Sequence, residues 1–227
     1  PRNTYINTFF RGSLQLLIYK EGDLALNFSK RDINAYVGAD EYLLKISDLN
    51  GTIIYEERLL DDGDISNSSL ERKEMNYSLY LDNLNGFYLL SLINILNDTP
   101  SDSKIGNLVI NTNKVLIKGN FLVIEPFSFY VKNDFPQNID FYYWHKGRNQ
   151  TIEVINDKFS KEIYLSDEYR GKKFRYSMEP NENIFIINKS YIWVFNDLIV
   201  APSKDEWFDI PITLQQSIND PDLIILD

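Results

Sequence analysis

Leu108-Val-Ile-Asn-Thr-Asn-Lys-Val-Leu-Ile-Lys-Gly-Asn-Phe-Leu-Val-Ile-Glu-Pro126 decides the fold, because the same pattern occurs once more near the end of the chain. The second, altered copy is Ile184-Phe-Ile-Ile-Asn-Lys-Ser-Tyr-Ile-Trp-Val-Phe-Asn-Asp-Leu-Ile-Val-Ala-Pro202. Both copies run from an apolar strand through an Asn-containing turn, a second apolar strand and a short polar break to a third strand and a proline. Repeated units of this kind indicate a modular architecture. We therefore interpret each copy as the closing strands of one β-domain and the exit from it.

The rest of the chain is also typical of β-structure. Leu24, Leu26 and Phe28 alternate with small or polar residues, which is the period of a half-buried strand. Asn50-Gly51 is a hairpin signal, because this dipeptide tolerates the positive φ angles of tight β-turns. No window shows helical periodicity over a dozen residues. The sequence predicts an all-β protein of two tandem antiparallel β-sandwich domains, either jelly-roll or immunoglobulin-like.

The two copies of the repeat set the predicted domain boundaries. We expect an N-terminal β-sandwich over residues 1–125 and a smaller second one over residues 126–202. Residues 203–227 then form a C-terminal tail strand. This tail starts a further module, is donated to a neighbouring subunit, or folds back onto the second domain.

Composition excludes several functional classes. The chain of 227 residues carries 23 basic and 33 acidic residues, a net charge of −10, and shows no basic stripe, so we predict no nucleic-acid partner. It has no cysteine, which excludes disulfides, thiol nucleophiles and Cys-ligated metals. No apolar run reaches the roughly 18 to 20 residues that span a bilayer. Pro1 is not an initiator Met, so we expect a mature, partial or engineered form.

Asn-x-Ser/Thr triplets are more frequent than the composition predicts, with about two or three expected by chance. Such triplets accept N-linked glycans on exported proteins, so they predict a glycosylated extracellular chain. The alternative is that these Asn residues only form turns in an Asn-rich chain. The candidate acceptors are Asn27, Asn50, Asn67, Asn76, Asn97, Asn149 and Asn188.

One acidic turn is a candidate metal site. Asp61, Asp62 and Asp64 surround Gly63, and hard cations such as Ca²⁺ prefer several carboxylate oxygens on a bent backbone. The twelve-residue loop of an EF-hand is absent. The alternatives are a structural Ca²⁺ site and a solvated acidic turn, and we predict no other cofactor.

Catalytic patterns are missing, and we predict that the chain is not an enzyme. His145 is the only histidine, and it follows an aromatic strand rather than a nucleophile motif. Exposed aromatic residues could instead stack on sugar rings in a carbohydrate-binding or accessory domain of a secreted protein. The candidates are Tyr142, Trp144 and Trp193. The competing interpretation is that these rings pack in the core.

Several short motifs carry a family resemblance. They are Arg11-Gly12, Leu24-x-Leu-x-Phe-x-Lys-Arg-Asp32, Tyr36-x-Gly-Ala-Asp40, the Asn-Gly hairpin and Asp61-Asp-Gly63. This pattern, mainly over residues 10–95, resembles archaeal cell-surface proteins built of tandem β-sandwich modules, similar to S-layer or sheath components. The resemblance implies an exported, glycosylated lattice protein, sometimes with bound Ca²⁺. Its expected partners are copies of itself, other surface-layer subunits and covalent glycans, at the cell surface. The absence of a leader and an anchor leaves open whether the chain assembles by itself or is one section of a longer protein.

Overall fold

The computed structural model describes residues 2–33, 37–63, 74–95, 103–143, 150–188, 191–195 and 199–210. These residues form sixteen β-strands and two short 3-10 helices, so the prediction of an all-β protein is confirmed. Every strand pairing is antiparallel, and the strands form two sheets. None of the helices in the described part of the chain has the length and apolar character needed to cross a membrane.

The first lobe is built around two long strands that pair along their whole length. β2 and β5 are both kinked near their middle, where the register shifts beside Gly22, whose φ is 85°. The first half of β2 pairs with β7 and the second half with β6, so one strand contributes to two regions of the sheet. The strands of this lobe are β1 (Thr4–Arg11), β2 (Leu14–Arg31), β3 (Glu41–Asp48), β4 (Ile53–Leu59), β5 (Glu74–Ile95), β6 (Lys104–Ile110) and β7 (Val115–Lys118).

The second lobe has the strand arrangement of a jelly roll. Its eight strands form two four-stranded layers, β8-β15-β10-β13 and β9-β14-β11-β12, and the chain crosses repeatedly between them. Of the two predicted sandwich types, the strand order selects the jelly roll for this lobe. The strands are β8 (Phe121–Val123), β9 (Phe127–Asn133), β10 (Gln137–Tyr143), β11 (Gln150–Ile155), β12 (Ser160–Leu165), β13 (Lys173–Met178), β14 (Asn181–Ile187) and β15 (Ile192–Phe195).

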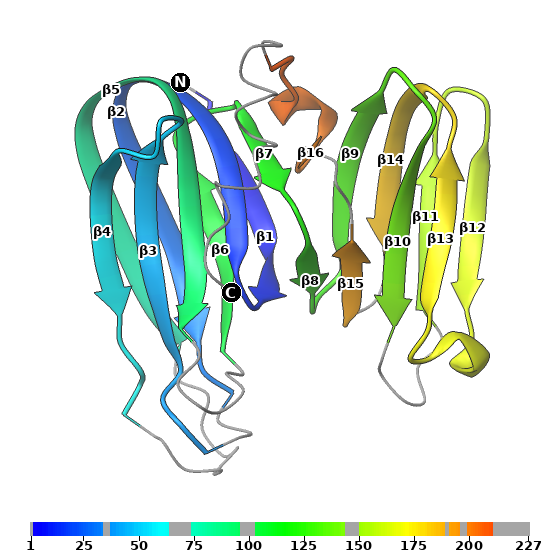
Figure 1. Ribbon diagram of the computed structural model, residues 1–227, viewed down its shortest axis with the longest axis horizontal. Helices are drawn as coiled ribbons and strands as arrows, with labels where there is room; N and C mark the ends of the chain where they lie inside the picture. Colours follow the sequence, from blue (N-terminus) through cyan, green and yellow to red (C-terminus); the bar gives the residue numbers. More distant parts are fainter. Residues whose placement is uncertain are drawn as a thin grey trace.

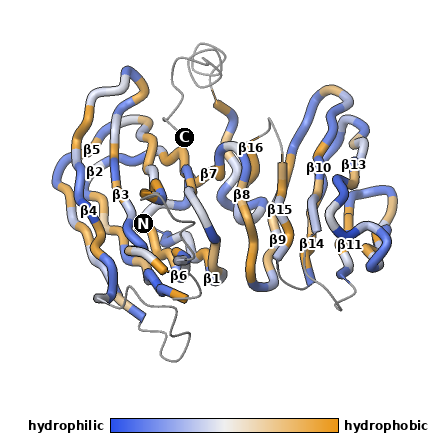
Figure 2. Tube along the Cα trace, turned by 60° about the horizontal axis from the view of Figure 1, so that its bottom comes forward, coloured by the Kyte–Doolittle hydropathy of each residue, from blue (hydrophilic) through white to orange (hydrophobic). Residues whose placement is uncertain are grey.

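One sheet runs through both lobes. Its order is β13-β10-β15-β8-β1-β6-β2-β5-β3-β4, with β8 pairing to β1 on one side and to β15 on the other (Figure 1). A chain of aromatic contacts continues the core across this junction from Phe10 through Phe121 and Phe129 to Phe185. Figure 2 shows hydrophobic residues recurring along the strands of both lobes. The lobes therefore share one hydrophobic core cluster.

The two similar segments of the sequence pair with each other. The first copy contains the end of β6 with β7 and β8, and the second contains the end of β14 with β15 and β16 (Ile199–Val200). β8 pairs with β15, and β7 pairs with β16. We interpreted each copy as the exit from a separate domain, whereas together they form the seam between the lobes. The division at residues 125 and 126 stays a prediction, and β8 pairs across it.

The described part of the tail folds back onto the protein. Residues 204–206 form the 3-10 helix η2 (Lys204–Glu206), where the sequence predicted a strand. Trp207 packs edge-to-face on Tyr130, with ring centroids 5.5 Å apart, and Phe208 contacts Phe87. This tail segment therefore covers a cluster around Leu17, because its aromatic rings are more stable against apolar neighbours than in water. The remaining residues of the predicted tail, 211–227, lie outside the described residues.

Candidate functional site

Three carboxylates from two loops converge at the end of the first lobe where β2 and β4 terminate. Asp32 follows the end of β2, and Asp61 and Asp62 follow β4. Each offers one oxygen, and these oxygens all lie within 4.8 Å of one another. We call these three residues the acidic cluster. The sequence predicted Asp61, Asp62 and Asp64 as ligands, and the structure brings the first two together with Asp32, whereas Asp64 lies outside the described residues.

A buried ion pair anchors the acidic cluster. The Lys30 ammonium lies 2.6 and 2.5 Å from the two oxygens of Asp32, and both side chains are inaccessible to solvent. Burial, assisted by the charges of Asp62 and Asp61, raises the pKa of Asp32 to about 6 against the opposing effect of Lys30.

Backbone amides hold the two loops in place around the cluster. The amide of Asp62 donates to Asp32 Oδ2 at 3.1 Å, and the amide of Asp40 donates to Asp61 Oδ1 at 3.0 Å. The amide of Gly63 donates to Asp61 Oδ2 at 2.9 Å. These bonds fix carboxylate oxygens on a bent backbone, which is the donor type that a hard cation prefers. The residues present fit a divalent cation in donor chemistry, and Lys30 is the group with which such a cation would compete for Asp32.

Asp32 was not among the predicted ligands, although the sequence contains the signal. Lys30 continues the alternation of Leu24, Leu26 and Phe28, so it falls on the buried face of β2. A lysine in that phase requires a counter-ion, because an unpaired buried charge is costly. Asp32, two residues further on the same face, is the nearest carboxylate in sequence.

Four predicted glycan acceptors lie in the described residues, and all four are exposed: Asn27, Asn50, Asn76 and Asn188. The other three, Asn67, Asn97 and Asn149, lie outside the described residues.

Two of the triplets face each other across β2 and β5. Ser78 Oγ donates to Asn27 Oδ1 at 2.6 Å, and Ser29 Oγ donates to Asn76 Oδ1 at 2.9 Å. Each asparagine therefore uses the other triplet's serine as a cross-strand partner. By contrast, Asn50 lies at the tip of the β3–β4 turn, where only its backbone amide is tied, to Asp48. Asn50 is thus the more open acceptor.

Two of the three predicted sugar-stacking residues, Tyr142 and Trp193, lie together on the outer face of the second lobe. Tyr142 on β10 is directly opposite Trp193 on β15, and both are half-buried. Phe195, which the sequence did not single out, stacks on Trp193 with centroids 5.9 Å apart, and Lys173 lies 4.5 Å above its ring. Trp144 lies outside the described residues. These rings form a small aromatic patch, in which Trp193 also packs against the buried cluster of Phe9, Leu122 and Ile124.

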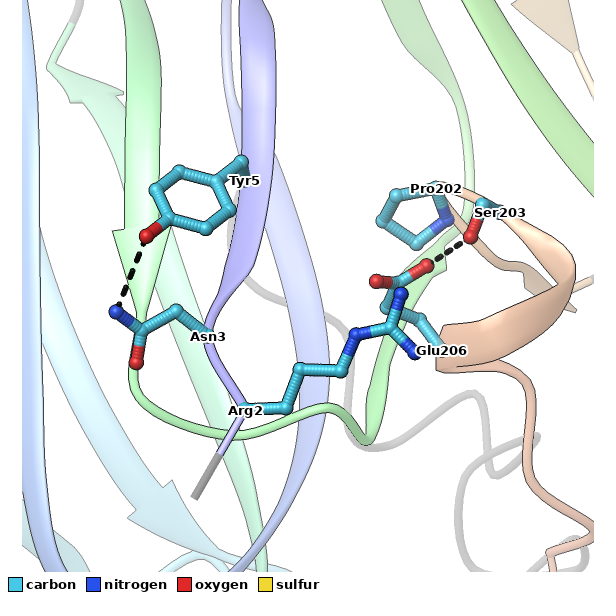
Figure 3. A pocket seen from close by; sticks show the side chains of 6 residues that line it. All are labelled: Arg2, Asn3, Tyr5, Pro202, Ser203 and Glu206. Atoms are coloured by element: carbon cyan, nitrogen blue, oxygen red, sulfur yellow. Dashed lines mark hydrogen bonds between the residues drawn. The ribbon is translucent and has the colours of Figure 1, made fainter.

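A pocket lies between the N-terminal segment and the tail (Figure 3). It is lined by Arg2, Asn3, Tyr5, Pro202, Ser203 and Glu206. Its polar groups bond to one another or to neighbours: Ser203 Oγ contacts Glu206, and Arg2 pairs with Asp205 at 2.6 Å. The pocket residues therefore join the tail to the first strand.

Comparison with known proteins gives no family. No family model matches the chain, and no curated protein matches it. Among solved structures, the chain is similar at 12% identity to the dimeric latent PorU from Porphyromonas gingivalis, with a TM-score of 0.27. The match covers 87% of this chain and spans 19% of that one. At that TM-score the likeness carries no argument about fold or function.

Proposed function

We propose that this chain is a structural cell-surface protein, of the S-layer or filament type, that associates with copies of itself through the edges of its β-sandwich lobes. The proposal assigns it no catalytic activity. It places the chain outside the cell with glycans on its exposed asparagines, and its partners are further copies or other surface-layer subunits.

The observation that carries the proposal is the free edge at β4. Within the described residues, β4 pairs with β3 alone, and six of its seven residues are exposed or half-buried. Ile53 and Ile54 are 51% and 42% exposed on this edge. An edge strand presents unpaired amides and carbonyls, and proteins that stay monomeric usually protect such edges. The edge of β9 is protected in this way, because Tyr130 exchanges backbone bonds with Ala201.

Sedimentation velocity over a concentration series tests the proposal. We expect the wild-type chain to form larger species as its concentration rises, and Ile53→Lys/Ile54→Lys to shift the distribution toward monomer. Ile184→Lys is the matched control, because Ile184 is exposed on β14, which pairs on both sides. A wild-type chain that remains monomeric at about 1 mM, a concentration that detects even weak association, contradicts the proposal.

Glycosylation is tested by intact-mass measurement of protein from its native source. We expect a mass above the 26.6 kDa of the polypeptide, with sugar mapped to Asn50. A native mass equal to that of the bare polypeptide would remove the glycoprotein part of the proposal and leave self-association to be judged by sedimentation.

A structural Ca²⁺ at the acidic cluster is a further part of the proposal. What supports it is the convergence of one oxygen from each of Asp32, Asp61 and Asp62 within 4.8 Å of one another. Such an ion would lock the loops after β2 and β4 together, beside the β4 edge. Thermal unfolding should show a higher midpoint with millimolar Ca²⁺, and Asp61→Asn/Asp62→Asn should lose this shift. Equal midpoints with Ca²⁺ and with a chelator argue against the ion.

Carbohydrate binding is the second candidate, favoured by the aromatic patch of Tyr142, Trp193 and Phe195. Aromatic faces stack on apolar faces of sugars, and half-buried rings lose little entropy on binding. Pull-down on insoluble polysaccharides should then retain the wild-type chain and release Trp193→Ala. Tyr5→Ala, an exposed ring on β1, is the control. Equal behaviour of the wild type and Trp193→Ala argues against this function.

A further inference from the structure

The sheet that runs through both lobes has two free ends, β4 and β13. In the described residues, β4 pairs with β3 alone and β13 with β10 alone. The two strands lie toward opposite ends of the molecule's longest axis (Figure 1). We propose that β4 of one copy pairs with β13 of the next copy, so that the sheet continues from molecule to molecule. This inference rests on the proposed self-association and specifies its geometry.

Strand direction favours this contact. Nine pairings separate β13 from β4 along the sheet, and each of them is antiparallel. An odd number of reversals leaves β4 and β13 pointing in opposite directions, as the arrows in Figure 1 also show. A second copy displaced along the long axis, without being turned over, therefore presents its β4 antiparallel to β13 of the first. Antiparallel pairing needs no further rearrangement.

The faces of the two strands also correspond. Tyr55 on β4 and Phe174 on β13 both pack against the shared core cluster, so each marks the inner face of its strand. Glu56 and Lys173 point to the other face and are exposed. In an antiparallel pair, directly opposite residues lie on the same face of the sheet. Continuing the sheet therefore joins inner face to inner face and outer face to outer face.

One register brings opposite charges together. Placing Tyr55 opposite Phe174 sets Glu56 opposite Lys173 by the fixed counting of an antiparallel ladder, and Lys172, the residue just before β13, falls beside Glu57. All four of these charged side chains are exposed in the single chain.

Arg58, the other charged residue on β4, does not disfavour this register. Arg58 is held by Glu41, to which its Nε donates at 2.8 Å, so its positive charge is already compensated. By the same counting, Ile53 and Ile54 lie opposite Tyr176 and Arg175 in the middle of β13, and the charge of Arg175 is paired with Asp140. The partner that fits the β4 edge is thus a second copy of this chain.

The contact is heterologous, because it joins two different surfaces. A heterologous contact produces a ring if the rotation closes and an open filament if it does not. Each added copy offers a new β4 edge and a new β13 edge, so growth is limited by concentration alone. This arrangement differs from a two-fold dimer, in which both copies would use the same strand.

Charge exchange between two variants tests the pairing. Glu56→Lys/Glu57→Lys makes both edges basic, and Lys172→Glu/Lys173→Glu makes both edges acidic. Each variant alone should need at least about tenfold more protein for half-assembly, because like charges face each other. An equimolar mixture should assemble like the wild type, since basic and acidic edges then alternate. Sedimentation velocity and negative-stain microscopy measure this, and unchanged thermal midpoints of the single variants confirm folding.

The outcomes separate the pairing from the proposed function. If both variants assemble alone as the wild type does, the β4–β13 pairing is wrong while self-association stands. If the wild type itself remains monomeric, both proposals fall. If the variants lose assembly and the mixture does not recover it, the edges matter but do not pair with each other, and the inference is overturned.

Cross-linking gives a second measurement that does not depend on stability. The chain contains no cysteine, so single-cysteine variants report one position each. Directly opposite residues have Cβ atoms about 4.5–5.5 Å apart, close to the reach of a disulfide. A mixture of Glu56→Cys and Lys173→Cys should form a mixed covalent dimer on oxidation. A mixture of Glu56→Cys and Tyr5→Cys is the control, and equal yields from the two mixtures contradict the pairing.

Discussion

The buried pair of Lys30 and Asp32 should make the protein less stable as the pH rises from 4 to 6.5. Burial raises the pKa of Asp32 to about 6 in the folded chain, while its ordinary value is 3.8. Between these values the folded state binds a proton that the unfolded state releases. Increasing pH therefore favours unfolding in this range. The stabilisation that comes from the proton on Asp32 is complete below pH 4 and is lost as the pH rises through about 6.

The magnitude follows from the difference between the two pKa values. One pKa unit corresponds to about 1.4 kcal/mol, so about two units give an upper limit of about 3 kcal/mol in the free energy of unfolding. Other carboxyl groups change the free energy of unfolding in a different pH range. A bond from Arg175 lowers the pKa of Asp140, and a bond from Tyr80 lowers that of Asp23. Their contributions are lost only as the pH falls below about 4.

Urea unfolding followed by tryptophan fluorescence, at half-unit steps from pH 4 to 7, measures this slope. The control is Lys30→Met/Asp32→Asn, which removes both charges and keeps an oxygen to accept the amide of Asp62. Exchanging a buried ion pair for neutral groups is often close to neutral for stability, so this variant should fold and show a flat profile. The reasoning is refuted if wild-type stability rises over this range, or if the variant keeps the wild-type slope.

Three further predictions concern packing and modification. Gly106→Ala should lower stability by about 1–3 kcal/mol in urea unfolding, because its Cβ would lie 2.3 Å from the Thr8 carbonyl oxygen, and an unchanged midpoint would contradict this close contact. Phe129→Ala should cost about 3–5 kcal/mol, since this ring lies between Phe121 and Phe185; Tyr164→Ala, on an exposed ring, should cost far less in the same assay. Ser29→Ala should cost about 1 kcal/mol by losing its bond to Asn76 even in unglycosylated recombinant protein, so an effect confined to glycosylated material would refute this role.

Local pattern was enough to predict the strands and several of their turns. The alternation of Leu24, Leu26 and Phe28 predicted a half-buried strand, and all three are buried in β2. The Asn50-Gly51 signal predicted the β3–β4 turn, where Gly51 has a φ of 85°. These features depend on residues close in sequence, because side-chain period and positive φ are properties of a few neighbouring positions.

Asn and Gly residues were misleading inside β5, because a tight turn and a kink in a continuous strand both use them. The stretch Asp82-Asn-Leu-Asn-Gly86 is typical of a turn between two strands, but β5 continues through it from Glu74 to Ile95. Asn83 and Gly86 have φ angles of 56° and 133° within this strand. Positive φ permits either a reversal or a kink, and only pairing with β2 over its whole length decides between them.

The sequence by itself determined the all-β class, the position of several strands and two of the three carboxylates in the acidic cluster. Only the tertiary structure decided that the two similar segments pair with each other and that Asp32 accepts a bond from the amide of Asp62, thirty positions further along the chain. It also decided which strands, β4 and β13, are left at the ends of the sheet. The physical reason is that periodicity fixes which face of a strand is buried. Which distant strand lies beside it depends on the packing of the whole core.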